Sequence, residues 1–219
     1  MPEVKGQRRD YRSPVREEAA RRTRRAVVAA ATTLFTERGY TGASLRDVAE
    51  LAGVARPTAA AVFGSKPALL RQVLDEALAG DDEPVPVARR PWFAPVWEAA
   101  HPVDVLRAYS EVCLVIARRA GRLFEVTRRA ADESAEIGQL WVTLVQNRRA
   151  GAEMVVRKVR ETGPLRRDLD LDRAIDALWV LNDPAHYMAL VVERGWSDAE
   201  FTAWLTTQMT AALLDASVP

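Results

Sequence analysis

The chain has 219 residues, with 31 basic and 30 acidic side chains and a formal net charge of +1. With 48% hydrophobic and 28% charged residues, it has the composition of a folded globular protein, which excludes a disordered or fibrous chain. One cysteine and two histidines exclude an intramolecular disulfide and argue against a structural zinc site. We therefore expect neither a metal nor a cofactor.

The hydropathy pattern argues against a membrane or secreted protein. The longest apolar runs have six residues, whereas a membrane-spanning helix needs about 18. The N-terminal residues are charged from Lys5 onward and contain no apolar segment of signal-peptide length. We expect a cytoplasmic protein.

The balanced total charge hides an uneven distribution. Residues 1–71 hold 14 basic and 7 acidic residues, an excess of +7, whereas residues 72–219 hold 17 and 23, an excess of −6. A basic first third indicates contact with a polyanion. The alternative is a solvated, arginine-rich surface, which charge counts alone leave open.

Helical periodicity runs through almost the whole chain and predicts an all-α fold. Gly39 ends the first helix, and Ser44 caps the second, with Asp47 in place for a short capping box. Gly53 breaks the second helix, and Ser65 caps the fourth. The first four helices are expected over 16–38, from 44 to the break at 53, over 56–63 and over 65–78.

The stretch 80–102 contains five prolines, so no long helix crosses it. Its aromatic residues Trp92, Phe93 and Trp97 make it too apolar for a free linker, and we expect it to pack on the rest of the chain. No alternating strand pattern and no internal repeat is present. Later helices are expected over 103–119, 122–132, 135–161, 171–193 and 198–215.

Residues 44–63 carry the strongest functional signal. They comprise a short helix, a tight turn around Gly53 and a second short helix, with apolar residues where the pair would pack together. This is the helix-turn-helix arrangement, in which the second helix enters the major groove of DNA. Helical hairpins are common in all-α cores, so the pattern alone is of moderate specificity.

The wider segment from Thr23 to Leu70 resembles the DNA-binding domain of the TetR family of bacterial transcriptional regulators. About 48 residues match in order and without gaps. The C-terminal part resembles the family more weakly, at 178–179, 183–184, 190–191 and 194–197. The matching N-terminal residues are Ala30, Ala31, Leu34 to Tyr40, Ser44 to Ala49, Ala52 to Val54, Pro57, Thr58, Phe63 to Lys66, Leu69 and Leu70.

The resemblance implies three parts: a basic flexible arm over 1–15, a helix-turn-helix DNA-binding domain over 16–71, and a helical ligand-binding and dimerisation domain over 72–219. It also implies a set of DNA-binding residues. The expected set is Ser44, Arg46, Ala55, Arg56, Pro57, Thr58, Ala61 and Lys66.

The implied recognition helix covers residues 55–61. Arg56 and Thr58 would reach base edges at its N-terminal end, where an arginine can donate two hydrogen bonds to guanine. Pro57 and Ala61 would contact thymine methyl groups. Ser44 and Arg46 open the preceding helix, whose N-terminus can hold a phosphate, and Arg46 can also reach a base. Lys66 matches the family's phosphate-contacting lysine.

Two positions depart from the family pattern. Ala55 stands where serine or threonine usually caps the recognition helix, and Ala60 stands where tyrosine is usual. We expect DNA binding to persist, because the arginine-rich residues 5–25 can add phosphate contacts. The alternative is weak binding to DNA.

A single helix-turn-helix reads only a few base pairs, so we expect a homodimer that reaches two half-sites. The two C-terminal helices are its expected surface, and the alternative is that their apolar residues bury within their own domain. The expected contact residues are Leu178, Leu181, Ala185 and Met188 on one helix, and Phe201, Leu205, Met209, Ala212 and Leu213 on the other.

A regulator of this kind usually also responds to an effector ligand. All six tryptophans lie outside the DNA-binding segment, where they could contribute to a ligand pocket. We expect an apolar cavity between helices, with Asn182 and His186 as polar groups one helical turn apart. For each residue taken singly, plain core packing is the alternative. The candidate lining is Tyr109, Cys113, Phe124, Trp141, Val145, Trp179, Asn182 and His186.

These observations favour a sequence-specific transcriptional repressor that a small apolar or aromatic effector releases from its operator. An activator of the same fold and a non-specific DNA-binding protein are the alternatives. An enzyme is disfavoured because no GxSxG, HExxH or phosphate-binding glycine loop is present. Cys113 lies in an apolar run that indicates a buried, inert thiol.

Overall fold

The computed structural model describes residues 14–215, and every regular element within that range is helical, which confirms the all-α class. α1 is interrupted at Gly39, where φ is +71°, so regular helix ends at the predicted residue. The predicted arm over 1–15 lies outside the described residues except for its last two. The N-terminal helices are α1 (Pro14–Gly42), α2 (Leu45–Leu51), α3 (Arg56–Phe63) and α4 (Lys66–Ala79).

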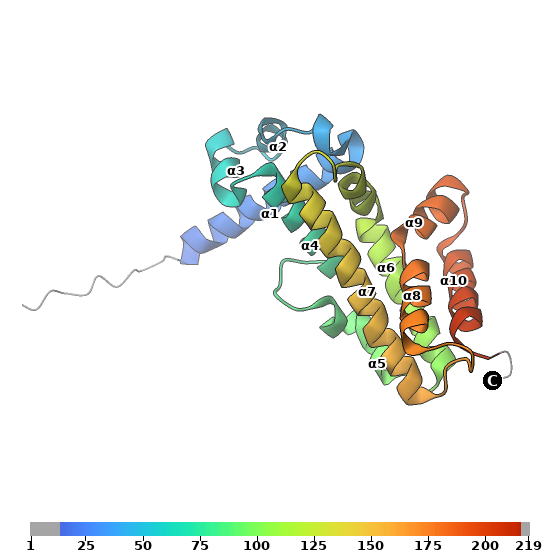
Figure 1. Cartoon of the computed structure of the whole chain (residues 1–219). Helices are drawn as coiled ribbons and strands as arrows, with labels where there is room; N and C mark the ends of the chain where they lie inside the picture. The colour runs from blue at the N-terminus through green and yellow to red at the C-terminus, as the bar shows by residue number, and fades with distance from the viewer. Residues whose placement is uncertain (1–13, 216–219) are drawn as a thin grey trace, which may run out of the picture.

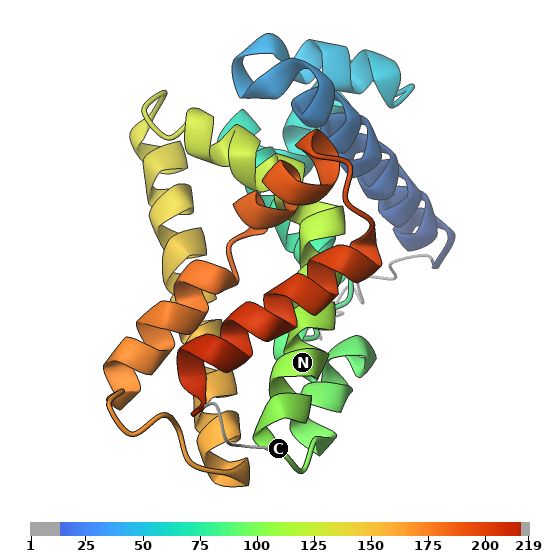
Figure 2. The same cartoon turned by 90° about the vertical axis from the view of Figure 1, so that its right-hand side faces the viewer.

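The remaining helices form a bundle that extends away from α2 and α3 (Figure 1). α10 crosses over α6 and lies beside α8, as the second view shows (Figure 2). A π-helical segment, Met188–Glu193, follows α9. The helices of the bundle are α5 (Ala94–Glu98), α6 (Pro102–Arg129), α7 (Ala135–Thr162), α8 (Leu171–Leu181), α9 (Pro184–Tyr187) and α10 (Asp198–Leu213).

The predicted division between helices 103–119 and 122–132 is wrong, because α6 runs unbroken through Gly121. A glycine inside a helix costs only about 1 kcal/mol relative to alanine, which the packing of a long helix outweighs. A Cβ at Gly121 would lie 3.2 Å from the sulfur of Met188. The glycine therefore permits the close approach of the segment that follows α9.

The predicted single helix over 171–193 is also wrong. α8 ends at Leu181, and the chain restarts as α9 after Asp183, whose carboxylate accepts a hydrogen bond from the Ala185 amide at 2.9 Å. Pro184 has no N–H to donate to the preceding turn and its ring clashes with that turn, so the helix cannot continue across it. This break moves the residues beyond Asp183 off the line of α8.

The irregular stretch between α4 and α6 packs on the body, as expected. Arg90 is buried and donates hydrogen bonds to the carbonyls of Glu83 and Val85 and to both carboxylate oxygens of Asp81. Phe93 is buried and stacks on Trp97 at 5.0 Å between ring centroids. The segment 81–93 is thus a fixed wall of the body.

Two apolar cores hold the described residues together. The body core contains five of the side chains expected at the dimer surface, so these contact their own domain, as the alternative interpretation had it. They are Leu178, Phe201, Leu205, Met209 and Leu213.

The other core joins the N-terminal helices to the bundle. It contains Leu34 and Phe35 of α1 together with Leu123 of α6 and Ile137 of α7. The predicted domain boundary between residues 71 and 72 falls inside α4, which is one continuous helix. We call α1 to α4 the head and the rest the body, but the two share this core.

Candidate functional site

The helix-turn-helix is set by hydrogen bonds close in sequence. The Asp47 amide donates to the Ser44 hydroxyl oxygen at 3.2 Å, and the Ser44 amide donates to the Asp47 carboxylate at 3.0 Å. The Ser44 hydroxyl also donates to that carboxylate, and these bonds lower the pKa of Asp47. The predicted capping box is therefore confirmed.

The turn between α2 and α3 needs a glycine. Gly53 has φ +66°, in the left-handed region that other residues rarely adopt. The next amide, of Val54, donates a hydrogen bond to the Ala49 carbonyl at 3.0 Å. The Val54 side chain packs against the core that head and body share. This turn fixes α3 at an angle to α2 at the end of the molecule (Figure 1).

Seven of the eight predicted DNA-binding residues lie exposed on this motif. Arg46 projects from α2, where its guanidinium lies 3.9 Å from Asp47. The predicted residues of α3 all lie in the first two turns of that helix. The exposed residues are Ser44, Arg46, Ala55, Arg56, Pro57, Thr58 and Ala61.

Lys66, the eighth, is half-buried at the start of α4. Its ammonium nitrogen lies 4.0 Å from the centroid of the Tyr40 ring, a cation–π contact. Desolvation lowers the pKa of Lys66, opposed by the carboxylates of Glu133 and Asp47. A phosphate contact would have to draw the ammonium group away from Tyr40.

Sequence reasoning missed a second contact of this kind. The Arg24 guanidinium lies 4.8 Å from the centroid of the Phe63 ring, which ties α1 to the last residue of α3. No local pattern signals it, because the two residues are 39 positions apart. The contact helps to fix the angle of α3.

A cleft of about 640 Å³, which we call the body cleft, lies between α4 of the head and the segment 81–88, α6 and α7 of the body. Three of the predicted lining residues, Tyr109, Phe124 and Asn182, face it. Apolar side chains from four different elements add to these walls. They are Leu78, Phe93, Ile116, Leu144 and Met154.

A hydrogen-bonded polar network forms part of the cleft lining. The Arg148 guanidinium donates to Asp183 at 2.7 Å, to the Trp179 carbonyl at 2.8 Å and to the Asn182 side-chain oxygen at 3.1 Å. Asn182 in turn donates to the Tyr109 hydroxyl at 2.9 Å. Burial raises the pKa of Tyr109, so the phenol stays neutral and serves as a hydrogen-bonding group.

Five predicted pocket residues do not line this cleft. Burial raises the pKa of the Cys113 thiol to about 12, which fits a thiol that takes no part in chemistry. Trp179 reaches the network through its carbonyl, and Val145 lines neither this cleft nor the cavity at the junction of head and body. His186 lies beyond the break at Pro184, where its Nε2 is 3.0 Å from the Val180 carbonyl.

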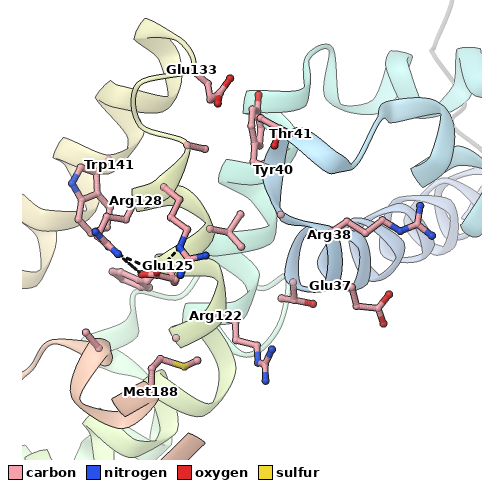
Figure 3. A pocket seen from close by; sticks show the side chains of 18 of the residues that line it. Glu37, Arg38, Tyr40, Thr41, Arg122, Glu125, Arg128, Glu133, Trp141 and Met188 are labelled. Atoms are coloured by element: carbon pink, nitrogen blue, oxygen red, sulfur yellow. Dashed lines mark hydrogen bonds and ion pairs between the residues drawn. The ribbon is translucent and has the colours of Figure 1, made fainter. Parts of the chain in front are cut away.

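The fifth residue, Trp141, lines that second cavity of about 730 Å³ at the junction of head and body (Figure 3). Tyr40 and Thr41 of the head face α6 across it, and Glu125 is paired with Arg128 and Arg129. Phe124 lines both cavities and meets Trp141 edge to face at 6.5 Å. The predicted aromatic set is therefore divided between two sites.

The sequence did not indicate Arg148 or Gly151 as cleft residues. Arg148 reads as one more charge on a helix, and its partners stand 31 to 35 positions further along the chain. Gly151 lines the cleft, and a Cβ added there would meet nothing within 4 Å.

Within residues 14–215, no group of three histidine, cysteine, aspartate or glutamate side chains is placed to hold a metal ion. No helix in the same range is long and apolar enough to cross a membrane.

Residues 27–73 match the model of the family described as bacterial regulatory proteins, tetR family. The matched segment contains all of α2 and α3 and most of α4. Residues 27–73 therefore form a TetR-family DNA-binding domain. The chain is a DNA-binding transcriptional regulator, a class of protein without catalytic activity.

Similarity to known proteins extends beyond the 47 residues of the family match. The HTH-type transcriptional regulator TtgR of Pseudomonas putida is 28% identical over 177 residues, covering 76% of this chain and 79% of that protein. A transcriptional regulator of Saccharomonospora viridis, solved in complex with choline, has a TM-score of 0.68 at 21% identity over 91% of this chain and 99% of its own. A TetR regulator of Chloroflexus aurantiacus has a TM-score of 0.66 at 21% identity over 90% and 98%. The two structures share the fold.

We predict that Arg56 and Lys66 of this TetR-family domain contribute differently to DNA binding. Arg56→Ala should weaken binding to the cognate site and remove about 1–3 kcal/mol of discrimination at one base pair. Lys66→Ala should weaken binding to all sequences alike and reduce the salt dependence by about one phosphate contact. Fluorescence anisotropy on cognate and mutated duplexes measures both effects. An Arg56→Ala variant with unchanged sequence preference would show that α3 does not read bases as placed here.

Proposed function

We propose that this TetR-family regulator is a repressor that leaves its operator when a small apolar or aromatic effector enters the body cleft. The observation that carries the proposal is the joint presence of an exposed α3 and a largely apolar cleft, linked by one core. The choline complex of the Saccharomonospora viridis neighbour supports a small-molecule input for a protein of this fold. Repression is preferred to activation because it is the commoner outcome in the family.

The proposed DNA contacts follow the exposed side chains of α2 and α3. Arg56 and Thr58 read bases, Pro57 and Ala61 contact thymine methyl groups, and Ser44 and Arg46 hold a phosphate at the start of α2. Ala55 offers no side-chain cap, although its carbonyl accepts a hydrogen bond from the Thr58 amide at 2.9 Å. Lys66 supplies a further phosphate contact.

The proposed homodimer uses the outer faces of α8 and α10. Their inner faces fill the body core, so the surface available to a partner consists of the remaining side chains. Val180 is 53% exposed on α8, and Trp204 is half-buried on α10. Two helices from each copy would form a four-helix bundle and place the two heads on successive turns of DNA.

Binding to the upstream region of its own gene tests the proposal. Anisotropy of a labelled duplex, with excess bulk DNA and at two salt concentrations, separates specific from non-specific binding. We expect tight binding that persists with competitor, and transcription from that duplex in vitro should fall. Binding lost to competitor on this duplex and on selected random sites would support a non-specific DNA-binding protein, and increased transcription would support an activator.

The cleft offers a variant that blocks effector entry without straining the fold. A Cβ at Gly151 would meet no neighbouring atom within 4 Å, so Gly151→Phe can add a ring to the cleft lining; operator affinity should stay within about two-fold, while release by any cleft-binding compound should be lost. Ala150→Phe is the matched control, because Ala150 is exposed and does not line the cleft. Anisotropy with a panel of aromatic compounds, first selected by tryptophan quenching, measures release. Equal release from both variants would place the effector elsewhere.

A further inference from the structure

We propose that the effector of the cleft carries a positive charge on an apolar or aromatic body. This inference rests on the proposed function of the cleft and names the chemical class of its ligand. The cationic group is received by the carboxylates of Asp75, Glu76 and Glu83, and the body of the molecule lies against the aromatic walls.

The charged groups that line the cleft are strongly unbalanced. Arg148 is the only cationic side chain among the lining residues. The lining also includes five carboxylates, which we call the rim. An excess of negative charge of this kind concentrates cations and repels anions over the distance of a Debye length. The rim consists of Asp75, Glu76, Asp81, Asp82 and Glu83.

Ion pairs account for the cation and for two of the carboxylates. Asp81 is held by the buried Arg90 at 2.6 Å, and Asp82 by Arg25 of α1 at 3.2 Å. Arg148 is itself neutralised by Asp183 at 2.7 Å. The one cationic side chain among the lining residues is therefore already paired.

The other three carboxylates have no such partner. Among the described side chains, those of residues 17–58 and 61–215, no cationic group forms an ion pair with Asp75, Glu76 or Glu83. Glu76 accepts a hydrogen bond from the neutral side-chain amide of Gln72 at 2.8 Å, which leaves its charge uncompensated. Three negative charges thus remain at the mouth of the cleft.

Asp75 shows the cost of this arrangement. Part of its side chain is open to solvent, but desolvation by the surrounding walls raises its pKa, against the opposing effect of Arg71. A carboxylate in this position gains more from a nearby cation than one in open water, because the local dielectric is lower. A bound cation would offset this desolvation cost by its attraction to the carboxylate.

The remaining lining selects the kind of cation. Phe93, Tyr109 and Phe124 supply aromatic surface in the same cleft, which suits the apolar part of an organic ion. A bare metal ion does not fit, since the described residues contain no three-ligand cluster that would hold one. The chemistry therefore matches an organic cation with a substantial apolar body.

Two rigid ions of the same shape and opposite charge test the inference. Isothermal titration of the full chain with tetraphenylphosphonium and with tetraphenylborate measures the effect of charge alone. We expect the cation to bind at least about ten-fold more tightly, since one favourable against one unfavourable charge contact corresponds to that ratio or more. Gly151→Phe should abolish binding of the cation.

Neutralising single carboxylates of the rim should weaken binding of the cation in steps. Asp75→Asn and Glu76→Gln should each weaken tetraphenylphosphonium binding by about three-fold or more. The control Glu161→Gln removes an exposed carboxylate of α7 that does not line the cleft, and it should change nothing.

Equal or tighter binding of tetraphenylborate, still blocked by Gly151→Phe, would overturn the cation inference and leave the effector cleft in place. Binding of neither ion by protein that still binds its operator would overturn the inference without affecting the assignment as a DNA-binding regulator. Cation binding that Gly151→Phe does not weaken would also overturn it, because the site would lie elsewhere.

Discussion

The structure depends on one apolar core that head and body share. Buried residues of α1 and α4, such as Phe35 and Leu70, belong to the same cluster as Leu123 of α6 and Ile137 of α7. Protein interiors are close-packed and do not deform continuously. A displacement of α6 or α7 near the cleft therefore cannot be absorbed within the body alone, and it changes the packing of the helices that carry α2 and α3.

Two further features connect the cleft to the head. Phe124 lines both the body cleft and the cavity at the junction, so a ligand against one face of its ring acts on a residue that borders the head. Asp82 lines the cleft and is also paired with Arg25 on α1. A cationic ligand at the rim would compete with Arg25 for this carboxylate. An effector shifts DNA affinity only if it binds the two arrangements of the heads unequally, and these contacts supply a basis for that difference.

The sequence predicted the head well because its signals are local. The capping box of Ser44 and Asp47, the turn at Gly53 and the cap at Ser65 each involve residues within a few positions, so their spacing predicts their contacts. The helix break at Pro184 had an equally local signal, which helical periodicity on either side obscured. The predicted division between 103–119 and 122–132 failed because the role of Gly121 depends on Met188, 67 residues away, whose sulfur a side chain at position 121 would crowd.

The cleft was predicted only in part, because its walls come from distant segments. Tyr109 and Asn182 meet through a hydrogen bond between residues 73 positions apart, and Arg148 joins them from a third helix. The aromatic composition indicated that a cavity exists, but it could not indicate which rings line the same cavity. In the structure, Trp141 and Tyr109 line different cavities. The sequence did not predict the carboxylate rim, because the rim depends on which carboxylates form ion pairs. Those pairs follow from the fold.

Amide hydrogen exchange on two core variants tests the shared core most directly. Leu123 and Leu205 are both fully buried and both lie outside the head, but only Leu123 belongs to the core that includes the head. Leu123→Ala should speed exchange in α1 and α4, whereas Leu205→Ala should speed it in α8 and α10 and leave the head protected. Equal effects of the two variants on the amides of α1 and α4 would contradict the account.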